Sequence, residues 1–580
     1  MIKKLVRQML TAQILSALTV SLCLLIDNIM IGRFLGERSL TAYGLSSPVL
    51  MVIGAVGSML CAGAQVACGK SLGRGDQRET NAGYSSAVAV AGLFSLAFVL
   101  LVFLIRMPLA RLMGADNPEL LGETGSYMAG FTIGAPASMG ALILVPFLQM
   151  AGQSNLLIAA VLGMTVSDVA LDLMNVLVFH GGMFGMGLAS SLSYYIAMLI
   201  GGGYFLSKKC VFKFSKKLVS RSKIAELVAG GVPTVISMAA SVVLIFAVNK
   251  MLLPIGGETA VAAYAVINTI INASNCISTG SGGVALTLSG ILYNEEDRTG
   301  LKELVGLMLR DAAALGVIVA ALLMVFARSC VTLFIPTEGA SQTLAIQGLR
   351  MFAVGLIPCC MNNALKNCWQ GTGRIRLMEI VSVMENAALP MLAAFVLSRF
   401  LGVTGAWCLF AVGEMLTSLM MLGIVWRRRG GVTFQQEALL LLDDRLGVPS
   451  KDGMEADICD MDGLMRFSRE AEDFCRSHGG IGRLATHLAL CVEEMGGNIV
   501  RHGFAKGNHL FIRLQTKEGL WTLRFRDDCK AFDPVSHIAG VTRADENVGI
   551  RLAMRIADEA RYTYSMNLNN LTLILRNERS

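Results

Sequence analysis

The stretch from Leu15 to Gly36, LSALTVSLCLLIDNIMIGRFLG, decides the fold of this chain. It is long enough to cross a lipid bilayer as a helix, and its single acid, Asp27, lies toward its C-terminal end. A carboxylate is costly inside lipid, so an acid at that depth usually faces a water-filled cavity or a partner group. The stretch therefore predicts a membrane-spanning helix that carries a functional carboxylate.

The rest of the chain divides into an apolar part and a tail of ordinary composition. Across 580 residues, 54% are hydrophobic and 16% are charged, which excludes a soluble globular protein of this size. The apolar runs end at Trp426, and the net charge of +7 lies entirely before Arg427, because equal numbers of basic and acidic residues follow. We therefore relate the excess charge to membrane topology and expect no nucleic acid partner.

Successive apolar runs predict about twelve spanning helices, which begin near residues 11, 46, 81, 124, 156, 184, 227, 259, 304, 345, 377 and 404. Assigning alternate loops to opposite sides places about 20 basic residues on one side and about 6 on the other. Because the basic side is normally cytoplasmic, both termini are expected in the cytoplasm. The chain is thus expected to be a multi-pass protein of the plasma (inner) membrane, with the lipid bilayer as a partner.

A sequence repeat divides the apolar part into two halves of six helices. Residues of the first half recur at one offset in the second: Gly36, Glu37, Leu40, Ala42, Tyr43, Gln149 and Gly152 match Gly257, Glu258, Val261, Ala263, Tyr264, Gln370 and Gly373. Gly182 and Gly185 recur as Gly402 and Gly405, one residue out of step. Parallel repeats favour a transporter whose site lies between or within the halves. A helix-packing motif repeated in a membrane protein without transport activity is the alternative.

Further acids lie in the predicted spans. Asp168 and Asp172 are four residues apart in the fifth apolar run, so they share one helical face. Two close carboxylates repel each other unless they share a cation or a proton, so this pair can hold Na⁺ or take up H⁺. A polar packing contact near the interface is the alternative. In the second half, Glu385 and Glu414 are expected to line a cavity or to pair with a neighbour.

Several motifs in order resemble one transporter family over roughly residues 5–426: Asp27–Gly36, the loops Gly73–Asp76 and Gly114–Pro118, Asp168–Asp172 and Gly185–Ser190. Together they resemble the multidrug and toxic compound extrusion (MATE) transporters. The resemblance implies two six-helix bundles that export small organic, often cationic, substrates in exchange for Na⁺ or H⁺. It also implies that Asp27, Asp168, Asp172 and Ser190 couple the cation, although Asn and Thr are more usual at the second and fourth of these positions.

The tail has the pattern of an α/β sandwich with helices on one face of a sheet. Residues 430–453 are predicted to form a linker and an entry strand. Helices are predicted at 462–476, 481–502 and 548–559, and further strands at 509–515, 520–526 and 571–575. On the helix from Ile481 to His502, one apolar stripe is expected to pack. The other face presents Glu494, Asn498 and His502.

These polar residues suit nucleotide chemistry. The amide oxygen of Asn498 can complete the coordination shell of a phosphate-bound Mg²⁺, and the carboxylate of Glu494 can take a proton from an attacking hydroxyl. Asp527, at a strand end, can accept a hydrogen bond from the adenine amino group. Gly549 opens a helix, where backbone N–H groups can meet phosphate.

Three segments carry a second resemblance, over roughly residues 450–577: Leu490–His502, Arg526–Pro534 and Asn547–Leu552. They resemble the GHKL-type (HATPase) ATP-binding domains of anti-sigma-factor serine kinases. The resemblance implies ATP and Mg²⁺ as cofactors, with Glu494 as general base, Asn498 as the Mg²⁺ ligand and Asp527 as the adenine contact. Glycine is typical of these domains at the positions of Cys529, Ala531 and Asn547. A Cβ at a position that needs positive φ lowers the affinity for the nucleotide. Nucleotide binding is expected, whereas kinase turnover stays open.

The resulting expectation is a polytopic helical membrane protein with a cytoplasmic α/β tail. Its predicted parts are an N-terminal lobe at 1–210, a basic linker at 211–226, a C-terminal lobe at 227–429, a second linker at 430–453 and an ATP-binding domain at 454–580. It is expected to be a cation-coupled antiporter with a regulatory or serine-kinase-like tail. The alternatives are a receptor whose membrane half controls a tail that phosphorylates or sequesters a cytosolic regulatory protein, and a tail that binds a partner without ATP.

Overall fold

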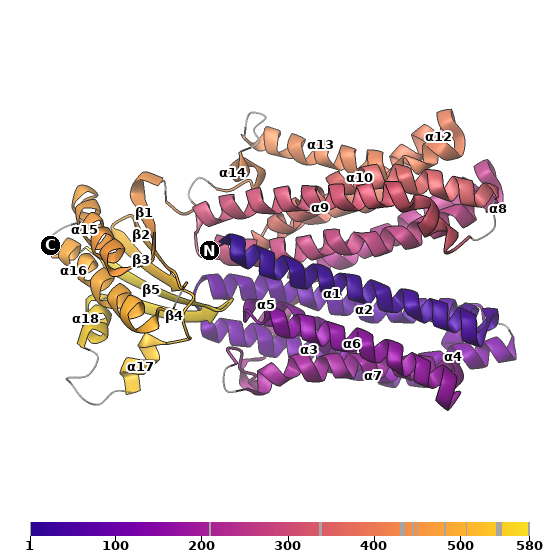
Figure 1. The fold of residues 1–580 in the computed structure, drawn as a ribbon, viewed down its shortest axis with the longest axis horizontal. Coiled ribbons are helices and arrows are strands. Elements are labelled where there is room, and N and C mark those ends of the chain that lie inside the picture. The colour runs from indigo at the N-terminus through magenta and orange to yellow at the C-terminus, as the bar shows by residue number, and fades with distance from the viewer. Residues whose placement is uncertain are drawn as a thin grey trace.

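The computed structural model describes residues 2–115, 117–207, 210–335, 339–429, 435–443, 446–448, 450–480, 483–505, 507–540 and 548–577. Two bundles of long helices lie side by side, and a domain with a β-sheet packs against one end of both (Figure 1). We call the bundles the N-lobe and the C-lobe, the last part the C-terminal domain, and the end of the helices beside it the tail-side end.

The helices of the two lobes follow one another along the chain with short turns. The N-lobe comprises α1 (Ile2–Met30), α2 (Glu37–Gly73), α3 (Gln77–Leu112), α4 (Pro118–Ile133), α5 (Ala135–Met150), α6 (Ser154–Met174) and α7 (Gly182–Gly202). The C-lobe comprises α8 (Arg221–Asn294), α9 (Arg298–Thr332), α10 (Ala340–Gly371), α11 (Ile375–Val383), α12 (Leu389–Trp407) and α13 (Leu409–Arg429). Wider π turns at Ile31–Leu35, Asn175–Phe179 and Met384–Ala388 extend α1, α6 and α11.

Within the described residues, ten helices are long and apolar enough to cross a membrane, or eleven if the bent pair α4 and α5 forms one span. The helix α1 is 29 residues long, which is also sufficient to cross. Large apolar side chains on the outer surface of α3, such as Leu93 and Leu104, are more than 70% exposed, as expected for contact with lipid. The multi-pass prediction is thus confirmed, although several helices begin earlier than the apolar runs: α2 starts at Glu37 rather than near residue 46.

The repeat seen in the sequence recurs in the backbone. Gly36 and Gly257 have φ of 93° and 62°, and each interrupts the helical path at the equivalent point of its lobe. The pairs Gly152 with Gly373 and Gly182 with Gly402 also have positive φ, a conformation that glycine adopts without steric cost. The long helix α8 therefore contains two spans that meet at Gly257. Equivalent breaks at equivalent glycines indicate two lobes built on one plan.

The two lobes touch closely at the tail-side end. A Cβ on Gly63 of α2 would lie 1.9 Å from the carbonyl oxygen of Leu227 in α8, and a Cβ on Gly231 would lie 1.9 Å from that of Met59. Further along the same helices, a Cβ on Gly73 would lie 2.4 Å from the carbonyl oxygen of Ile291. Glycine thus lets the backbones of α2 and α8 meet directly beside the C-terminal domain.

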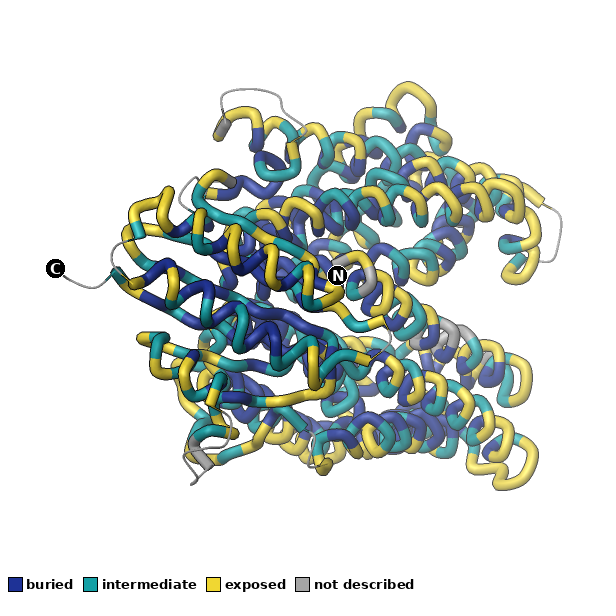
Figure 2. Tube along the Cα trace, turned by 60° about the vertical axis from the view of Figure 1, so that its left-hand side comes forward, coloured by how far each residue is buried: buried dark blue, intermediate teal, exposed yellow. Residues whose placement is uncertain are grey.

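The C-terminal domain is a five-stranded antiparallel sheet in the order β1-β2-β3-β5-β4. Its strands are β1 (Gly453–Ile458), β2 (Leu510–Lys517), β3 (Leu520–Asp527), β4 (Glu559–Ser565) and β5 (Leu568–Arg576). Its helices are α15 (Met461–Ser477), α16 (Leu484–Cys491), α17 (Pro534–Gly540) and α18 (Val548–Ile556), and α14 (Gln436–Leu439) lies in the preceding segment. Apolar residues on alternate strand positions pack against the helices, and Figure 2 shows the strands largely buried. The helices lie on the face away from the lobes (Figure 1), so the α/β sandwich is as predicted.

Two local predictions in the tail need correction. The helix expected at 548–559 ends at Ile556, and β4, which was not predicted, begins at Glu559. The entry strand expected within 430–453 lies later, as β1 at Gly453–Ile458. The helix expected at 481–502 is present from Leu484, since residues 481 and 482 lie outside the described part, and it widens into π turns at Val492–Gly496 and Ile499–Gly503.

Candidate functional site

The acids predicted in the N-lobe come together in its interior. Asp27 belongs to α1, Asp168 and Asp172 to α6, and Ser190 to α7. All four are buried, with at most 6% of each residue exposed. Asp27 lies near Asp172 and the Ser190 hydroxyl. The structure therefore brings together every residue proposed for cation coupling, from three helices that are distant in sequence.

These carboxylates lack the partners that normally offset buried charge. Both oxygens of Asp172, and one oxygen each of Asp27 and Asp168, accept no hydrogen bond within the part of the chain that the structure describes. No ion pair among the described residues involves any of the three. Because an uncompensated buried charge is unfavourable, a bound proton or cation would stabilise these carboxylates.

A small cavity adjoins Asp27 and Asp168. It offers about 20 Å³ to the centre of a water molecule, and its lining residues are Cys23, Asp27, Leu50, Tyr127, Phe131, Met164, Asp168, Ser190, Ser193 and Tyr194. A cavity needs about 10–15 Å³ on this measure to hold one water. The site therefore has room for a water or a bare ion, whereas an organic substrate would have to bind elsewhere.

Asn175, which follows the acids on α6, has a structural role. Its Oδ1 accepts a hydrogen bond from the Gly181 N–H at 3.1 Å, and its Nδ2 donates to the Gly182 carbonyl at 3.1 Å. These bonds close the turn between α6 and α7. They thereby help to hold Ser190 on α7 opposite the acids of α6.

The acids of the C-lobe are compensated. The Lys366 ammonium of α10 pairs with the Glu385 carboxylate, and both residues are buried. The Asn362 amide donates to Glu414 Oε2 at 2.9 Å and to the Glu414 carbonyl at 3.0 Å. Of the two roles expected for these acids, the structure shows pairing with a neighbour. Lys366 was not predicted as the partner of Glu385, although a lysine within an apolar run indicates a buried ion pair.

In the C-terminal domain, two of the predicted nucleotide residues meet. Glu494 lies in the π turn Val492–Gly496, and its carboxylate packs over the start of α18: a Cβ on Gly549 would lie 1.9 Å from Glu494 Oε2. Asn498 directly precedes the next π turn, one helical turn beyond Glu494. π turns in helices are frequent at functional sites. Glycine at 549 leaves space at the helix start that any other residue would fill.

Asp527 ends β3 on the sheet face that carries the helices. Its Oδ1 accepts hydrogen bonds from the Asn569 Nδ2 at 2.7 Å and from the Cys529 N–H at 3.0 Å. Burial raises the pKa of Asp527 above its ordinary value, and the hydrogen bond from Asn569 acts in the opposite direction. Asn569 was not predicted from sequence, because only the pairing of β3 with β5 brings it there.

Cys529, Ala531 and Asn547 stand where glycine is typical of the ATP-binding domains that the tail resembles. At the first two of these positions the backbone is not strained. Neither Cys529 nor Ala531 is among the described residues with positive φ. Burial raises the pKa of the Cys529 thiol to about 12, so it stays protonated at neutral pH. Asn547 lies outside the described residues.

Comparison with known proteins gives matches over the two lobes. The sequence profile named MatE matches residues 12–174 and 233–396, once in each lobe. The Multidrug export protein MepA of Staphylococcus aureus (strain NCTC 8325 / PS 47) is 23% identical over 422 residues, which span 71% of this chain and 90% of that protein.

Solved structures share the fold of the lobes. A crystal structure of MATE in complex with MaL6 has a TM-score of 0.69 at 20% identity and covers 76% of this chain and 98% of its own. An outward-facing multidrug resistance MATE family transporter of the MOP superfamily has a TM-score of 0.68 at 21% identity, over 76% and 97% of the two chains. A MOP superfamily transporter from Pyrococcus furiosus, whose binding pocket is described as reversed in polarity, has a TM-score of 0.69 at 20% identity, over 76% and 96%.

Proposed function

Because this chain belongs to the MatE family of transporters, we propose that it exports small organic compounds, cationic ones among them, in exchange for Na⁺ or H⁺. The observation that carries the proposal is the cluster of Asp27, Asp168 and Asp172, three buried acids whose described surroundings contain no basic partner. The protein is proposed to lie in the plasma (inner) membrane with both termini in the cytoplasm.

The chemistry of the cluster suits alternate loading and release of a cation. With a proton or Na⁺ bound, the repulsion between the carboxylates of Asp27 and Asp172 is relieved and the N-lobe can pack tightly around them. Ser190 and Ser193 can supply neutral oxygen ligands beside the acids, as hard cations prefer. Loss of the cation restores the repulsion, and this difference between two charge states can bias the lobes toward one of two arrangements.

The proposal is tested with the purified protein in liposomes under separate Na⁺ and pH gradients. Uptake or release of a cationic fluorescent dye is expected to follow one of the two gradients. Asp27→Asn should abolish gradient-driven transport without lowering the melting temperature, because it removes charge and keeps shape. Gradient-driven transport at the wild-type rate by the Asp27→Asn variant would refute the coupling role.

For the C-terminal domain we propose ATP and Mg²⁺ binding, with Glu494 as general base, Asn498 as Mg²⁺ ligand, and Asp527 and Gly549 as nucleotide contacts. The contact of the Glu494 carboxylate with the glycine at the start of α18 supports the proposal, because helix starts bind phosphate. Titration of the full chain in detergent with Mg-ATP should give binding heat that Asn498→Ala abolishes. The matched variant Asp462→Asn, on the exposed first turn of α15, should keep it. No heat from the wild-type chain would favour a tail that binds a partner without ATP.

A receptor is the second candidate function, because the C-terminal domain contacts both lobes directly. Ligand binding in the lobes would then alter phosphorylation or sequestration of a cytosolic regulatory protein by the tail. In this case the reconstituted chain would transport nothing, and the compounds that bind the lobes would change its Mg-ATP affinity.

A further inference from the structure

The face of the C-terminal sheet that lacks helices is strongly basic at its centre. Residues that face the same side of neighbouring strands include Arg513 on β2 and Arg524 and Arg526 on β3, since Arg513 pairs with Arg524 in the register of the sheet. This face is turned toward the lobes (Figure 1). It is not open to solvent, because Arg513 and Arg526 are each 6% exposed.

The C-lobe supplies the acids that these arginines need. The turn between α8 and α9 carries Glu295 and Asp297, which are 8% and 2% exposed. Arg513 Nη1 lies 2.6 Å from Asp297 Oδ1, and Arg526 Nη2 lies 2.5 Å from Glu295 Oε2. Burial alone would raise the pKa of Asp297, but the positive charges of Arg513 and Arg526 outweigh it and hold that pKa below its ordinary value. These are buried, specific ion pairs, which differ from exposed pairs formed by chance.

The same sheet also reaches the N-lobe through the turn between β4 and β5. The Met566 N–H donates to the Met150 carbonyl at 2.7 Å, and Asn567 Nδ2 donates to the Gly152 carbonyl at 2.8 Å. The Met566 side chain is 5% exposed and belongs to an apolar core that runs through the N-lobe and into the C-lobe. A Cβ on Gly152 would lie 2.4 Å from the Asn567 nitrogen, so this contact requires glycine.

We propose that the C-terminal domain is a clamp that holds the two lobes together at the tail-side end. The contacts to Glu295 and Asp297 lie on the C-lobe, those to Met150 and Gly152 lie on the N-lobe, and α2 and α8 meet between them. Opening of the lobes at this end must break one set of contacts. The effect on export rests on the proposed transport function, whereas the effect on lobe opening does not.

When the lobes open, the contact between the C-terminal domain and the N-lobe is the one that breaks. The C-lobe is joined to the domain by the chain itself, and the joining segment is bound to it: Trp369 Nε1 donates to the Leu439 carbonyl at 2.8 Å, and Arg298 pairs with Glu437 at 2.9 Å. The N-lobe contact is smaller: it consists of the turn between β4 and β5 and one exposed hydrogen bond, from Arg561 Nη1 to the Arg74 carbonyl at 3.2 Å. That turn is two residues from Asn569, the hydrogen-bond partner of Asp527, so a nucleotide that engaged Asp527 would act close to the releasing contact.

The clamp is tested by hydrogen exchange and by transport, with Met566→Asp compared with the volume-conserving Met566→Leu. Met566→Asp places a charge in the apolar core that runs through the N-lobe and should eject the turn. In the full chain, amide exchange should then rise several-fold at residues 148–156 and at the lobe contact formed by residues 59–73 and 227–231. Met566→Leu should exchange like the wild type. In liposomes, Met566→Asp should also raise the export rate.

The two readouts separate the clamp from the transport function. A wild-type chain that transports nothing would refute the export proposal, while the exchange at residues 59–73 would still decide whether the domain restrains the lobes. Faster exchange at residues 148–156 with unchanged exchange at 59–73 would show that the turn leaves without loosening the lobes, and this would overturn the clamp. Unchanged exchange at both places would overturn it as well.

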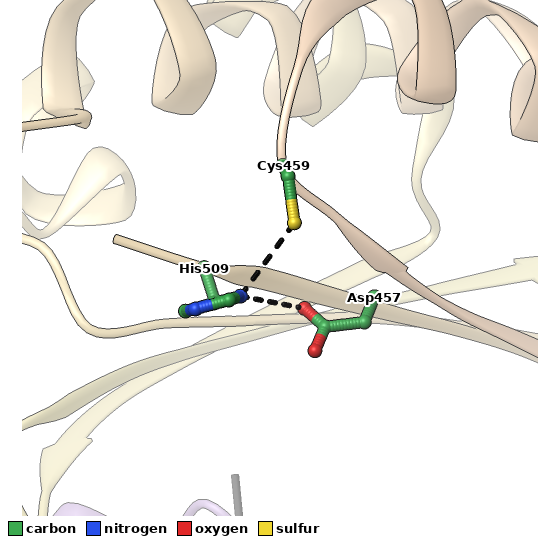
Figure 3. Close-up of side chains that lie close together, drawn as sticks. All are labelled: Asp457, Cys459 and His509. Atoms are coloured by element: carbon green, nitrogen blue, oxygen red, sulfur yellow. Dashed lines mark hydrogen bonds and ion pairs between the residues drawn. The ribbon is translucent and has the colours of Figure 1, made fainter. Parts of the chain in front are cut away.

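An independent observation concerns the end of the sheet at β1 and β2. Asp457 lies on β1, Cys459 directly follows this strand, and His509 directly precedes β2. In the antiparallel register Ile458 pairs with Leu510, so Cys459 stands opposite His509, and Asp457 shares their face. Figure 3 shows the three side chains converging at one point. All three residues are exposed.

Two distances between their ligand atoms match edges of a zinc tetrahedron, and all three atoms lie within 4.8 Å of one another. His509 Nδ1 lies 3.6 Å from Cys459 Sγ and 3.4 Å from Asp457 Oδ1. Zinc bonds of about 2.3 Å to sulfur and about 2.0–2.1 Å to nitrogen and oxygen separate sulfur from nitrogen by about 3.6 Å, and nitrogen from oxygen by about 3.3 Å, in a tetrahedron. Thiolate, imidazole and carboxylate together also suit Zn²⁺ better than Mg²⁺ or Ca²⁺.

We infer that Asp457, Cys459 and His509 form a Zn²⁺ site with a fourth position open to solvent. On binding, the Cys459 thiol releases its proton to solvent, and His509 coordinates through Nδ1 with its remaining proton on Nε2. The fourth position is available to water or to a ligand atom from another molecule. Three protein ligands and one open position distinguish this site from the closed zinc sites that only support a fold.

Co²⁺ is the spectroscopic probe for this site, used with the full chain. Added Co²⁺ should produce a thiolate-to-metal charge-transfer band that saturates at one ion per chain and disappears when Zn²⁺ is added. Cys459→Ser should abolish the band, and His509→Ala and Asp457→Asn should each weaken binding at least tenfold. Cys408→Ser, which alters a partly exposed thiol of the C-lobe, should leave the band unchanged. No charge-transfer band, or a band that survives Cys459→Ser, would overturn the zinc site.

Discussion

The two lobes share one plan but treat their buried acids in opposite ways. In the N-lobe, Asp27 and Asp172 lie together without a basic partner among the described residues. In the C-lobe, Glu385 is paired with Lys366, and Glu414 receives a hydrogen bond from Asn362. An acid that is permanently neutralised has no reason to exchange its cation, whereas an uncompensated one does. The duplicated fold thus places uncompensated acids in the first lobe and a buried ion pair in the second.

The strongest test of this contrast compares one acid from each lobe. Asp172→Asn should reduce gradient-driven export to the level of protein-free liposomes, because neither oxygen of Asp172 accepts a hydrogen bond in the described structure, so its charge is uncompensated. Glu414→Gln should retain export, because its amide oxygen can still accept the hydrogen bond from Asn362. Equal loss of export in both variants, measured with dye-loaded liposomes, would remove the distinction between the lobes.

A second test concerns folding of the C-lobe. Lys366→Met leaves the Glu385 carboxylate buried without its partner, and breaking one side of a buried pair costs about 3–5 kcal/mol. The melting temperature should fall clearly. The double variant Lys366→Met/Glu385→Met should recover most of this loss, since no charge stays behind. A Lys366→Met protein that melts like the wild type would contradict the structural role of the pair.

A smaller effect, on affinity for the coupling cation, is expected from removal of the Ser190 hydroxyl beside the N-lobe acids. Ser190→Ala removes one hydroxyl beside Asp27, and loss of one hydrogen-bonding group of this kind costs about 1 kcal/mol, or about fivefold in cation affinity. Transport should persist but need a higher concentration of the coupling cation. Ser418→Ala, which removes a hydroxyl that donates to Asn362 in the C-lobe, should leave that concentration unchanged.

The smallest expected effect is the pH dependence of the stability that Asp297, an acid outside the membrane-spanning helices, contributes. The pKa of Asp297 is held below its ordinary value, so its contribution to stability is fully present above about pH 3.9, the ordinary carboxyl value, and is lost as the pH falls through the lowered pKa. The difference in melting temperature between wild type and Asp297→Asn should therefore stay constant from pH 9 to pH 5 and shrink only in more acidic solution. A difference that changes near pH 7 would indicate another titrating group.

Sequence patterns predicted the lobes well because they depend on local properties. Apolar length located the spans, and the repeated glycines at 36 and 257 marked real breaks in the helices. The apolar runs missed only the helix ends that extend beyond lipid, as at Glu37 in α2. The four residues proposed for cation coupling also converge as expected, since the resemblance placed them in helices that pack together.

Other features depend on contacts that no single segment encodes. The partner of Glu385 was missed because Lys366 lies on a different helix, and the ion pairs of Asp297 and Arg513 join parts that are more than 200 residues apart. The strand β4 was missed because its start merges with the helical pattern of α18. The position of Cys459 opposite His509 follows only from the register of two strands.

The cavity beside Asp27 and Asp168, with its space of about 20 Å³, has one further consequence. A sodium ion in water carries a full shell of solvent molecules, and a space that holds about one water cannot admit that shell. A sodium ion that binds beside these carboxylates must therefore shed most of its hydration first, at a cost in free energy. A proton meets no such barrier.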